Sequence, residues 1–333
     1  MALKEVMFYE KEDAKVRCNI CAHHCSIAEN GYGVCRTRQN MDGKLYTLIY
    51  STVSSAHVDP IEKKPLYHFF PGSLVFSLGT ISCNFRCKHC QNWSISTAKV
   101  GDLYTTEMPP EEAVSRAKKS GCNGIVWTYN EPAIWFEYTY DSAKLAKRAR
   151  LYTVYVTNGY ISEEALNEMA PFLDAANVDV KAFSEDFYHN ICGAKLKPVL
   201  ETCERMLEKE IHIELTYLII PGYNDSEDEI KKFSEWVVDL NASIPVHFSS
   251  FYPAHQMLDV PPTSVETLEK AHGIAKEAGV EYVYLGNVPG HEYENTFCPK
   301  CGALLIERSG YHVRKRISTP ECPGCGRSIN IRL

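Results

Sequence analysis

The sequence predicts an α/β fold in which a parallel sheet closes, completely or partly, into a barrel. Strand-like and helix-like segments alternate from about residue 73 to residue 287 of the 333 residues, a pattern typical of βαβ units. Six or seven such units favour a barrel over a flat doubly wound sheet, although strand order stays open. Cysteine-rich stretches flank this region, so we expect three parts: an N-terminal cysteine-rich segment and connector at 1–72, a barrel core at 73–290 and a C-terminal module at 291–333.

Runs of apolar and β-branched residues mark the strands, and first-turn and capping residues mark the helices between them. Prolines and acidic residues at 109–112 begin one helix, and residues 162–170 form another. Ser226 with Glu229, and Thr263 with Glu266, have capping-box spacing and begin two more. The expected strands are 74–80, 124–130, 152–159, 177–183, 212–220, 246–251 and 282–287.

Composition restricts the class of protein. The formal net charge of −7 argues against broad, non-specific nucleic-acid binding. The sequence holds no apolar run long enough to span a membrane, and its first residues lack the apolar core of a secretory signal. We therefore expect a cytoplasmic protein without a membrane partner. In that reducing compartment, fourteen cysteines favour metal binding over disulfides.

Most of the cysteines fall into three groups. The three that remain are interpreted as small buried apolar residues, namely Cys122, Cys192 and Cys203. The grouped cysteines are Cys18, Cys21, Cys25 and Cys35, then Cys83, Cys87 and Cys90, and finally Cys298, Cys301, Cys322 and Cys325.

The two outer groups each have four cysteines, the number of a closed metal site. The C-terminal group consists of two Cys-Pro-x-Cys-Gly knuckles in a segment too short to fold on an apolar core alone. It predicts tetrahedral zinc, with rubredoxin-like iron as the alternative. The N-terminal group has the spacing C-x2-C-x3-C-x9-C, with His23 and His24 close by. We favour a structural zinc there, and an auxiliary iron–sulfur cluster stays open.

The middle group lies just after an expected strand, in the stretch SCNFRCKHCQNWSIS. Its C-x3-C-x2-C spacing supplies three ligands to a [4Fe–4S] cluster, which normally takes four from protein. One iron would then stay open to a ligand that is not protein. A zinc site completed by His89 is the alternative.

Residues 61–96, IEKKPLYHFFPGSLVFSLGTISCNFRCKHCQNWSIS, closely resemble the radical S-adenosylmethionine (radical SAM) superfamily. Within it, the chain resembles homologues of the pyruvate formate-lyase-activating enzyme, and most closely the radical SAM proteins of the AmmeMemoRadiSam system. The resemblance runs through essentially the whole chain. It implies a partial (β/α)6 barrel of the TIM type with a C-terminal zinc ribbon.

The resemblance also implies a chemistry. In this superfamily the open iron of the cluster binds S-adenosylmethionine, and the reduced cluster donates one electron to the sulfonium. The resulting 5′-deoxyadenosyl radical abstracts a hydrogen atom from substrate. The chain would thus be an oxidoreductase of the activating-enzyme type that works without oxygen. It would need a one-electron donor, such as a ferredoxin or flavodoxin, and a protein or other substrate that the sequence does not identify.

Further residues matching the family's motifs fall at the ends of expected strands, where barrel active sites assemble. The resemblance implies that Glu131, next to Asn130, lies near the amine of the methionine moiety. Lys181, in Asp179-Val180-Lys181, would pair with the carboxylate, with Asp179 orienting nearby donors. The remaining residues implied at the cofactor are Trp93 against the adenine, Asn158 in Thr157-Asn158-Gly159, and His247.

Several positions depart from the family pattern, and among them Tyr129 and Asn130 replace the glycines of a Gly-Gly-Glu-Pro turn. Val156 replaces an aspartate of activating enzymes, which weakens the case for a shared cation site. Ser82 replaces the usual glycine before the first cysteine, and it should be tolerated if its φ stays negative.

Three functions remain open. Asp179-Val180-Lys181 favours an activase that generates a glycyl radical on a partner enzyme. The C-terminal cysteines favour a radical SAM enzyme acting on another protein, RNA or small molecule, because activating enzymes commonly lack such a module. A non-catalytic zinc or iron–sulfur protein, or an electron carrier, is the alternative from another class.

Overall fold

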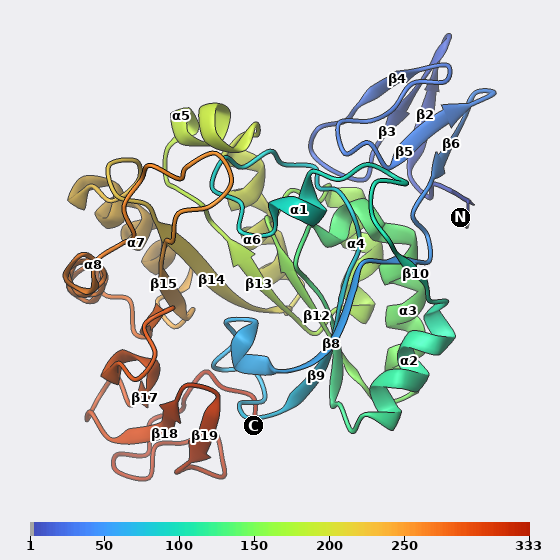
Figure 1. The fold of residues 1–333 in the computed structure, drawn as a ribbon. Helices are drawn as coiled ribbons and strands as arrows, with labels where there is room; N and C mark the ends of the chain where they lie inside the picture. Colours follow the sequence, from blue (N-terminus) through green and yellow to red (C-terminus); the bar gives the residue numbers. More distant parts are fainter. Residues whose placement is uncertain (1–2) are drawn as a thin grey trace.

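The computed structural model describes residues 3–333, which are built around one eight-stranded sheet. From β9 onward the strands pair in parallel and in chain order, whereas β8 pairs antiparallel with β9. A doubly wound sheet would reverse its order at a switch point, so this sequential order confirms the barrel type. Strands β8 and β16 are the two edges, and the barrel is therefore partial (Figure 1). The strands are β8 (Ser55–Pro60), β9 (Leu74–Gly79), β11 (Gly124–Trp127), β12 (Tyr152–Thr157), β13 (Ala175–Asp179), β14 (His212–Ile219), β15 (Val246–Ser250) and β16 (Val283–Gly286).

Helices follow each barrel strand from β9 to β15. The α-helices are α1 (Trp93–Ser96), α2 (Pro110–Lys119), α3 (Phe136–Arg148), α4 (Glu163–Met169), α5 (Glu185–Phe187), α6 (Lys197–Glu208), α7 (Glu227–Asn241) and α8 (Val265–Ala278). The 3-10 helices η1 (Ile61–Lys63), η2 (Pro132–Trp135), η3 (Ala170–Phe172) and η5 (Glu292–Glu294) and the π-helix η4 (Tyr188–Cys192) complete the set.

The predicted helix starts are confirmed except at α8. Ser226 caps α7 by accepting a hydrogen bond from the Glu229 amide. At α8 the prediction is off by one residue, because Ser264 accepts from the Thr267 amide. The Thr263 hydroxyl instead donates to the Ile219 carbonyl and accepts from the Phe251 amide, so it ties the end of β14 to the chain after β15.

Two small β modules flank the barrel on opposite sides of the molecule (Figure 1). The N-terminal strands form two three-stranded sheets, and the C-terminal strands form a third. A further pair, β7 (Thr52–Val53) and β10 (Thr106–Glu107), joins the connector to the chain before α2. The module strands are β1 (Lys4–Glu5), β2 (Tyr9–Glu12), β3 (Lys15–Cys18), β4 (Ser26–Ala28), β5 (Arg38–Met41) and β6 (Lys44–Thr47), then β17 (Thr296–Phe297), β18 (Leu304–Ser309) and β19 (His312–Lys315).

The two modules are packed differently. Val16, Ile27 and Leu45 of the N-terminal module belong to the same apolar core as the barrel. Leu305 and Ile306 of the C-terminal module belong to a separate cluster. Within residues 3–333, no helix has the length and apolar character that crossing a membrane requires.

Candidate active site

Three of the predicted site cysteines lie on residues 80–92, which we call the cluster loop. The loop joins β9 to α1 at the carboxyl edge of the parallel sheet. Cys83, Cys87 and Cys90 are all partly buried there. Burial raises the pKa of the Cys83 and Cys90 thiols, whereas the neighbouring Cys192 thiol, followed by burial, raises that of Cys87. A metal would therefore displace protons from all three thiols on binding.

The surroundings of this loop fit an iron–sulfur cluster. The Phe85 amide donates to Cys83 Sγ over 3.4 Å. Asn84 Nδ2 is a buried donor without a partner in the part of the chain that the structure describes. The sulfides of a cluster are acceptors that such donors can meet, and hydrogen bonds to sulfur tune its potential.

The zinc alternative for the loop does not fit. Among residues 3–333, only the C-terminal cysteines form a group of three or more ligand atoms that all lie within 4.8 Å of one another. The His89 ring is buried and packs against Phe187, with 5.9 Å between ring centroids. The loop thiols and His89 therefore do not form a zinc-sized group.

Asn130 holds the start of the cluster loop. Its Oδ1 accepts from the Thr80 amide (3.2 Å), and its Nδ2 donates to the Ser82 carbonyl (2.7 Å). Both bonds are to backbone, so the side chain fixes the path that leads into Cys83. The structure thus gives Asn130 a positioning role, and its contact with the cofactor stays a prediction.

Ser82 adopts a left-handed backbone conformation, which is unfavourable for a residue other than glycine. Its φ is +71°, so the condition under which serine was expected to be tolerated here is not met. A left-handed backbone costs a non-glycine residue roughly 1–2 kcal/mol. Two bonds offset that cost: the hydroxyl donates to the Cys35 carbonyl (2.6 Å) and accepts from Arg36 Nη2 (3.1 Å). The serine therefore ties the cluster loop to the N-terminal module.

Glu131 is buried and hydrogen-bonded by the protein itself. Its carboxylate accepts from the Ala133 amide (2.9 Å), the Thr157 hydroxyl (2.8 Å) and the Asn158 amide (2.8 Å). Burial raises the pKa of Glu131 to about 7. The side chain thus fastens the end of β12 to the turn after β11, and its contact with an amine stays a prediction.

Asn158 continues this chain of hydrogen bonds to the loop. Its Nδ2 donates to Asn84 Oδ1 over 2.9 Å, directly beside Cys83. Glu131, Asn158 and Asn84 therefore connect two strand ends to the first cluster cysteine.

Asp179 and Lys181 form a charged pair at the end of β13. Lys181 Nζ lies 3.0 Å from Asp179 Oδ2, and the lysine side chain is only 15% exposed. Burial opposes the lysine's charge, but Asp179 and then Cys87 raise the pKa of Lys181 well above its usual range. Asn224, in the turn that follows β14, donates to the Lys181 carbonyl and fixes this strand end.

Trp93 lies exposed at the start of α1, and its ring stacks on His255 with 5.6 Å between centroids. His255 follows β15, and the neighbouring Gln256 amide donates to the Lys88 carbonyl of the cluster loop. Sequence reasoning missed His255. Its position just past the carboxyl end of a strand was the signal that could have found it.

The structure gives His247 partners away from the cluster loop, and its contact with the cofactor stays a prediction. His247 is the second residue of β15, and it is buried with its Nε2 2.7 Å from Glu214 Oε2. Its ring packs edge-on against Tyr67. This buried network belongs to the amino-terminal half of the strands, whereas the cluster loop leaves their carboxyl ends.

Cys192 is the second residue that the sequence did not assign to the site. It is fully buried in η4, as expected of a small apolar residue. Its carbonyl accepts from the Arg86 amide (2.8 Å). Its thiol is the main cause of the raised pKa of Cys87. No sequence spacing links Cys192 to the loop.

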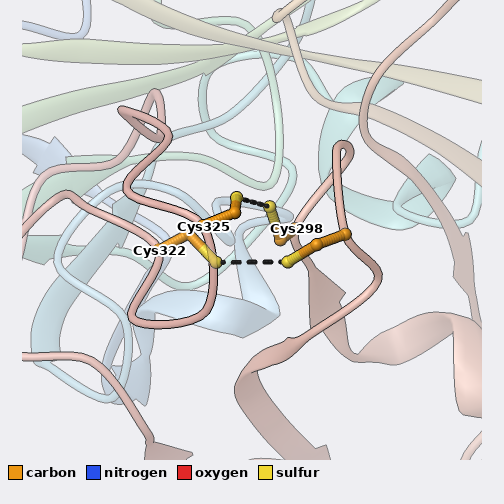
Figure 2. Close-up of side chains that lie close together, drawn as sticks. Cys298, Cys322 and Cys325 are labelled. Carbon is orange, nitrogen blue, oxygen red and sulfur yellow. Dashed lines mark hydrogen bonds between the residues drawn. The ribbon is translucent and has the colours of Figure 1, made fainter.

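The four C-terminal cysteines converge on one point. All four sulfurs lie within 4.8 Å of one another. Cys298 and Cys325 are 3.6 Å apart and Cys301 and Cys322 3.5 Å, as the dashed lines in Figure 2 mark. Tetrahedral zinc with bonds of about 2.3 Å places its sulfurs about 3.8 Å apart. The group therefore has the spacing of a single zinc ion.

The four N-terminal cysteines also meet, around one enclosed cavity that Arg38 and Ile134 help to line. Cys18 ends β3, and Cys35 lies in the turn before β5. Cys21 forms an isolated bridge with Ile161, just past β12. The cavity thus lies between the N-terminal module and the barrel.

A three-cysteine loop at the carboxyl edge of a partial parallel barrel defines the radical SAM class. The sequence model of the Radical SAM superfamily matches residues 78–234. The chain belongs to the radical SAM superfamily, with homology to the pyruvate formate-lyase activating enzyme and to other glycyl-radical activase-like proteins. This family supports an enzyme of S-adenosylmethionine-dependent radical chemistry and implies a [4Fe–4S] cluster.

Individual relatives cover much of the chain. The uncharacterized protein MJ0808 of Methanocaldococcus jannaschii is 47% identical over 336 residues, covering 99% of this chain and 100% of the relative. The pyruvate formate-lyase 1-activating enzyme of Escherichia coli K12 is 21% identical over 217 residues, covering 61% of this chain and 88% of that enzyme. A solved radical SAM methyltransferase from Sphaerobacter thermophilus shares the fold, with a TM-score of 0.52, 14% identity, and coverage of 85% and 76% of the two chains.

Proposed function

We propose that this chain cleaves S-adenosylmethionine reductively and directs the resulting radical at a protein or another substrate. When bound, the [4Fe–4S] cluster and S-adenosylmethionine supply a 5′-deoxyadenosyl radical that abstracts a hydrogen atom. The residues of this chain hold the cluster, orient S-adenosylmethionine and exclude water. Cys83, Cys87 and Cys90 are the proposed cluster ligands.

The observation that carries this proposal is the convergence of three strand ends, those of β11, β12 and β13, on the cluster loop that leaves β9. Asn130 fixes its start, and Asn158 bonds the residue beside Cys83. The Lys181–Asp179 pair lies at the next strand end, within the electrostatic influence of Cys87. A structural metal site would not require such a set of polar residues around one thiol loop.

The same residues offer complementary charges to S-adenosylmethionine. Lys181 is the proposed partner of its carboxylate, because the ammonium is held charged by Asp179. Asp179 is the carboxylate best placed for its amine, since protein donors already satisfy the buried Glu131. The exposed Trp93, stacked on His255, offers an aromatic face to the adenine.

The experiment is anaerobic reconstitution with iron and sulfide, followed by dithionite and S-adenosylmethionine. We expect 5′-deoxyadenosine and methionine in equal amounts. Cys83→Ala should abolish both products. Cys122→Ala is the matched control, because this buried thiol lies outside all three groups, and it should retain them. If the unchanged chain yields no 5′-deoxyadenosine, the proposal is wrong.

A glycyl-radical activase is the second candidate. It is favoured by Asp179-Val180-Lys181 and by similarity to the pyruvate formate-lyase 1-activating enzyme. A flavodoxin or ferredoxin would supply the electron in either case. The carbon-centred radical doublet in the EPR spectrum of a candidate partner would distinguish the two, since only an activase leaves a stable glycyl radical there.

We also propose zinc for the C-terminal cysteines, in a ribbon module spanning 291–333 after a barrel domain at 73–290. The tetrahedral spacing of the four sulfurs supports this (Figure 2). Metal analysis of purified protein should give about one zinc per chain. Iron in place of zinc would contradict the assignment.

A further inference from the structure

The N-terminal cysteines are too widely spaced for one zinc ion. No three of their four sulfurs lie within 4.8 Å of one another, because among residues 3–333 only the C-terminal set meets that limit. Zinc would hold every pair at about 3.8 Å. The three thiols of the cluster loop fail the same limit. In spacing, the N-terminal group thus resembles the loop and differs from the C-terminal group.

The cavity between these four cysteines supports the same distinction. It leaves about 10 Å³ for the centre of a water-sized sphere. Sulfurs around such a sphere stand about 3 Å or more from its centre, whereas zinc draws them in to about 2.3 Å. In a [4Fe–4S] cluster each cysteine binds a different iron, so the sulfurs stand further apart.

The ligand set around the cavity is complete without a histidine. His23 Nε2 lies 2.8 Å from the Asn84 carbonyl, and His24 Nδ1 lies 3.1 Å from Asn19 Oδ1. Two of the sulfurs accept hydrogen bonds, from the Val34 amide to Cys25 (3.4 Å) and from the Thr37 hydroxyl to Cys35 (3.2 Å). Four thiolates leave no open iron, which suits electron transfer rather than substrate binding.

The N-terminal group also touches the cluster loop directly. The Ser82 hydroxyl donates to the Cys35 carbonyl, so one hydrogen bond and one peptide bond link Cys35 to Cys83. The bond of His23 to the Asn84 carbonyl is a second link on the other side of Cys83.

Arg36 lies between the two groups. Its Nη2 donates to Ser82 Oγ and to the Ser96 carbonyl (3.3 Å). Its Nε is buried without a hydrogen-bond partner in the described part of the chain. Arg36 is only partly buried, but a cation with an unused buried donor between two thiol groups is expected where both carry anionic clusters, because a buried donor without an acceptor is costly.

We propose that Cys18, Cys21, Cys25 and Cys35 bind a second [4Fe–4S] cluster, which relays electrons to the cluster loop. The N-terminal cluster takes one electron from a ferredoxin- or flavodoxin-type donor and gives one electron to the loop cluster. No bond forms or breaks in this step, and no proton moves. The destination of the electron rests on the proposed function, whereas the metal assignment does not.

The metal assignment is tested on a chain whose cluster loop has no ligands. After anaerobic reconstitution, Cys83→Ala/Cys87→Ala/Cys90→Ala should keep about four irons of the about eight in the unchanged chain. Its EPR signal in the reduced state should not change when S-adenosylmethionine is added. Absence of iron from this variant, or zinc in its place, would overturn the assignment.

The reciprocal variant Cys18→Ala/Cys21→Ala should also keep about four irons, with an EPR signal that S-adenosylmethionine does change. Circular dichroism checks its fold. If this variant lost all its iron by unfolding, the cluster-loop variant would still decide the assignment.

The relay is tested by changing the reductant. Cys18→Ala/Cys21→Ala should lose at least about tenfold more 5′-deoxyadenosine formation with reduced flavodoxin than with dithionite, which can reach the loop directly. Equal losses with both reductants would overturn the relay. If the unchanged chain forms no 5′-deoxyadenosine even with dithionite, the proposed function fails, and the iron counts still decide the second cluster.

Discussion

The two four-cysteine groups have the same number of ligands and differ in spacing and place. The C-terminal sulfurs all lie within 4.8 Å of one another, at the separation of one tetrahedral ion. The N-terminal sulfurs surround a cavity and touch the cluster loop through Cys35 and His23. A count of cysteines therefore does not identify a metal site, because sulfur spacing and the neighbouring residues carry the distinction.

The groups are also attached to opposite ends of the barrel. Arg308 anchors the C-terminal module by donating to the Tyr67 carbonyl (2.7 Å) and the Thr296 hydroxyl (2.8 Å). Beside it, Glu214 accepts from the Tyr67 and His68 amides, in the amino-terminal half of β14. The N-terminal module is held at the carboxyl ends, beside the chemistry. The contrast agrees with the structural role proposed for one module and the redox role proposed for the other.

Removing zinc ligands should have the largest effect. Cys298→Ala/Cys301→Ala should lose all zinc and unfold residues 296–331, because zinc contributes on the order of 10 kcal/mol to such small modules. Hydrogen exchange and metal analysis measure this, with Cys122→Ala as control. Iron should not change. Continued protection of residues 296–331 would contradict a zinc-dependent fold.

Replacing Arg308, which anchors the C-terminal module, should have the next largest effect on stability. Arg308→Met should lower the free energy of unfolding by about 3–5 kcal/mol, because it leaves the buried Glu62 without a cation. Urea denaturation measures the loss. The matched control is Arg316→Met, whose partner Glu307 is at the surface, and it should cost less than about 1 kcal/mol. Equal losses would mean that burial of the pair does not matter.

Low pH should weaken the attachment of the C-terminal module at Glu214, which accepts from the Tyr67 and His68 amides. Burial alone would raise the pKa of Glu214, but hydrogen bonds from His212 and His247 hold it well below the usual range. A carboxylate with a depressed folded pKa stabilises the fold above its unfolded pKa, and that stability is lost as pH falls below about 4. Denaturation at pH 5 and pH 3 should show this drop, and Glu214→Gln should show a smaller one. An identical drop in both would exclude Glu214 as its cause.

Ser82 allows a finer test of the N-terminal attachment. Ser82→Ala keeps the left-handed strain and loses both hydroxyl bonds, so it should cost about 2 kcal/mol. Ser82→Gly loses the same bonds but relieves the strain, and it should cost about 1 kcal/mol less than alanine. Thermal unfolding measures the order of the two. Glycine as harmful as alanine would mean that φ is not strained at this position.

The smallest effect should come from a single hydrogen bond to sulfur. Thr37→Val removes the hydroxyl that donates to Cys35 Sγ. Because this bond stabilises the more negative reduced cluster, its loss should lower the reduction potential of the N-terminal cluster by tens of millivolts. Redox titration followed by EPR measures the shift, while the zinc content should stay the same. A rise in potential would contradict the assigned donor.

Much of the fold could be predicted from sequence. Strand-like runs predicted the seven parallel strands from β9 to β16, since a buried parallel sheet requires nearly continuous apolar segments. The antiparallel edge strand β8 was missed as a member of this sheet. Thr263 shows the limit of this approach. Its spacing to Glu266 matched a capping box, but a contact with the Ile219 carbonyl, distant in sequence, took the hydroxyl elsewhere.

The candidate site was less predictable where distant segments meet. His247 lies on β15, and His255 lies in the loop that follows this strand. Only the direction of the strand shows that His255, rather than His247, is on the side of the cluster loop. The left-handed Ser82 depends on the Cys35 carbonyl, 47 residues away in sequence. Likewise, the ligand spacing C-x2-C-x3-C-x9-C is compatible with either a zinc ion or a cluster. The distance between the sulfurs is set by the three-dimensional fold.

The bond between Ser82 and Cys35 has a consequence for how the protein matures. The carbonyl that offsets the strain at Ser82 comes from the N-terminal module, so the shape of the cluster loop depends on that module being folded. By thermodynamic linkage, whatever is bound by the N-terminal cysteines also favours the loop conformation. Loading of the two groups should thus be cooperative, and oxidative damage at Cys35 should be transmitted to the cluster loop through the hydrogen bond between the Cys35 carbonyl and Ser82.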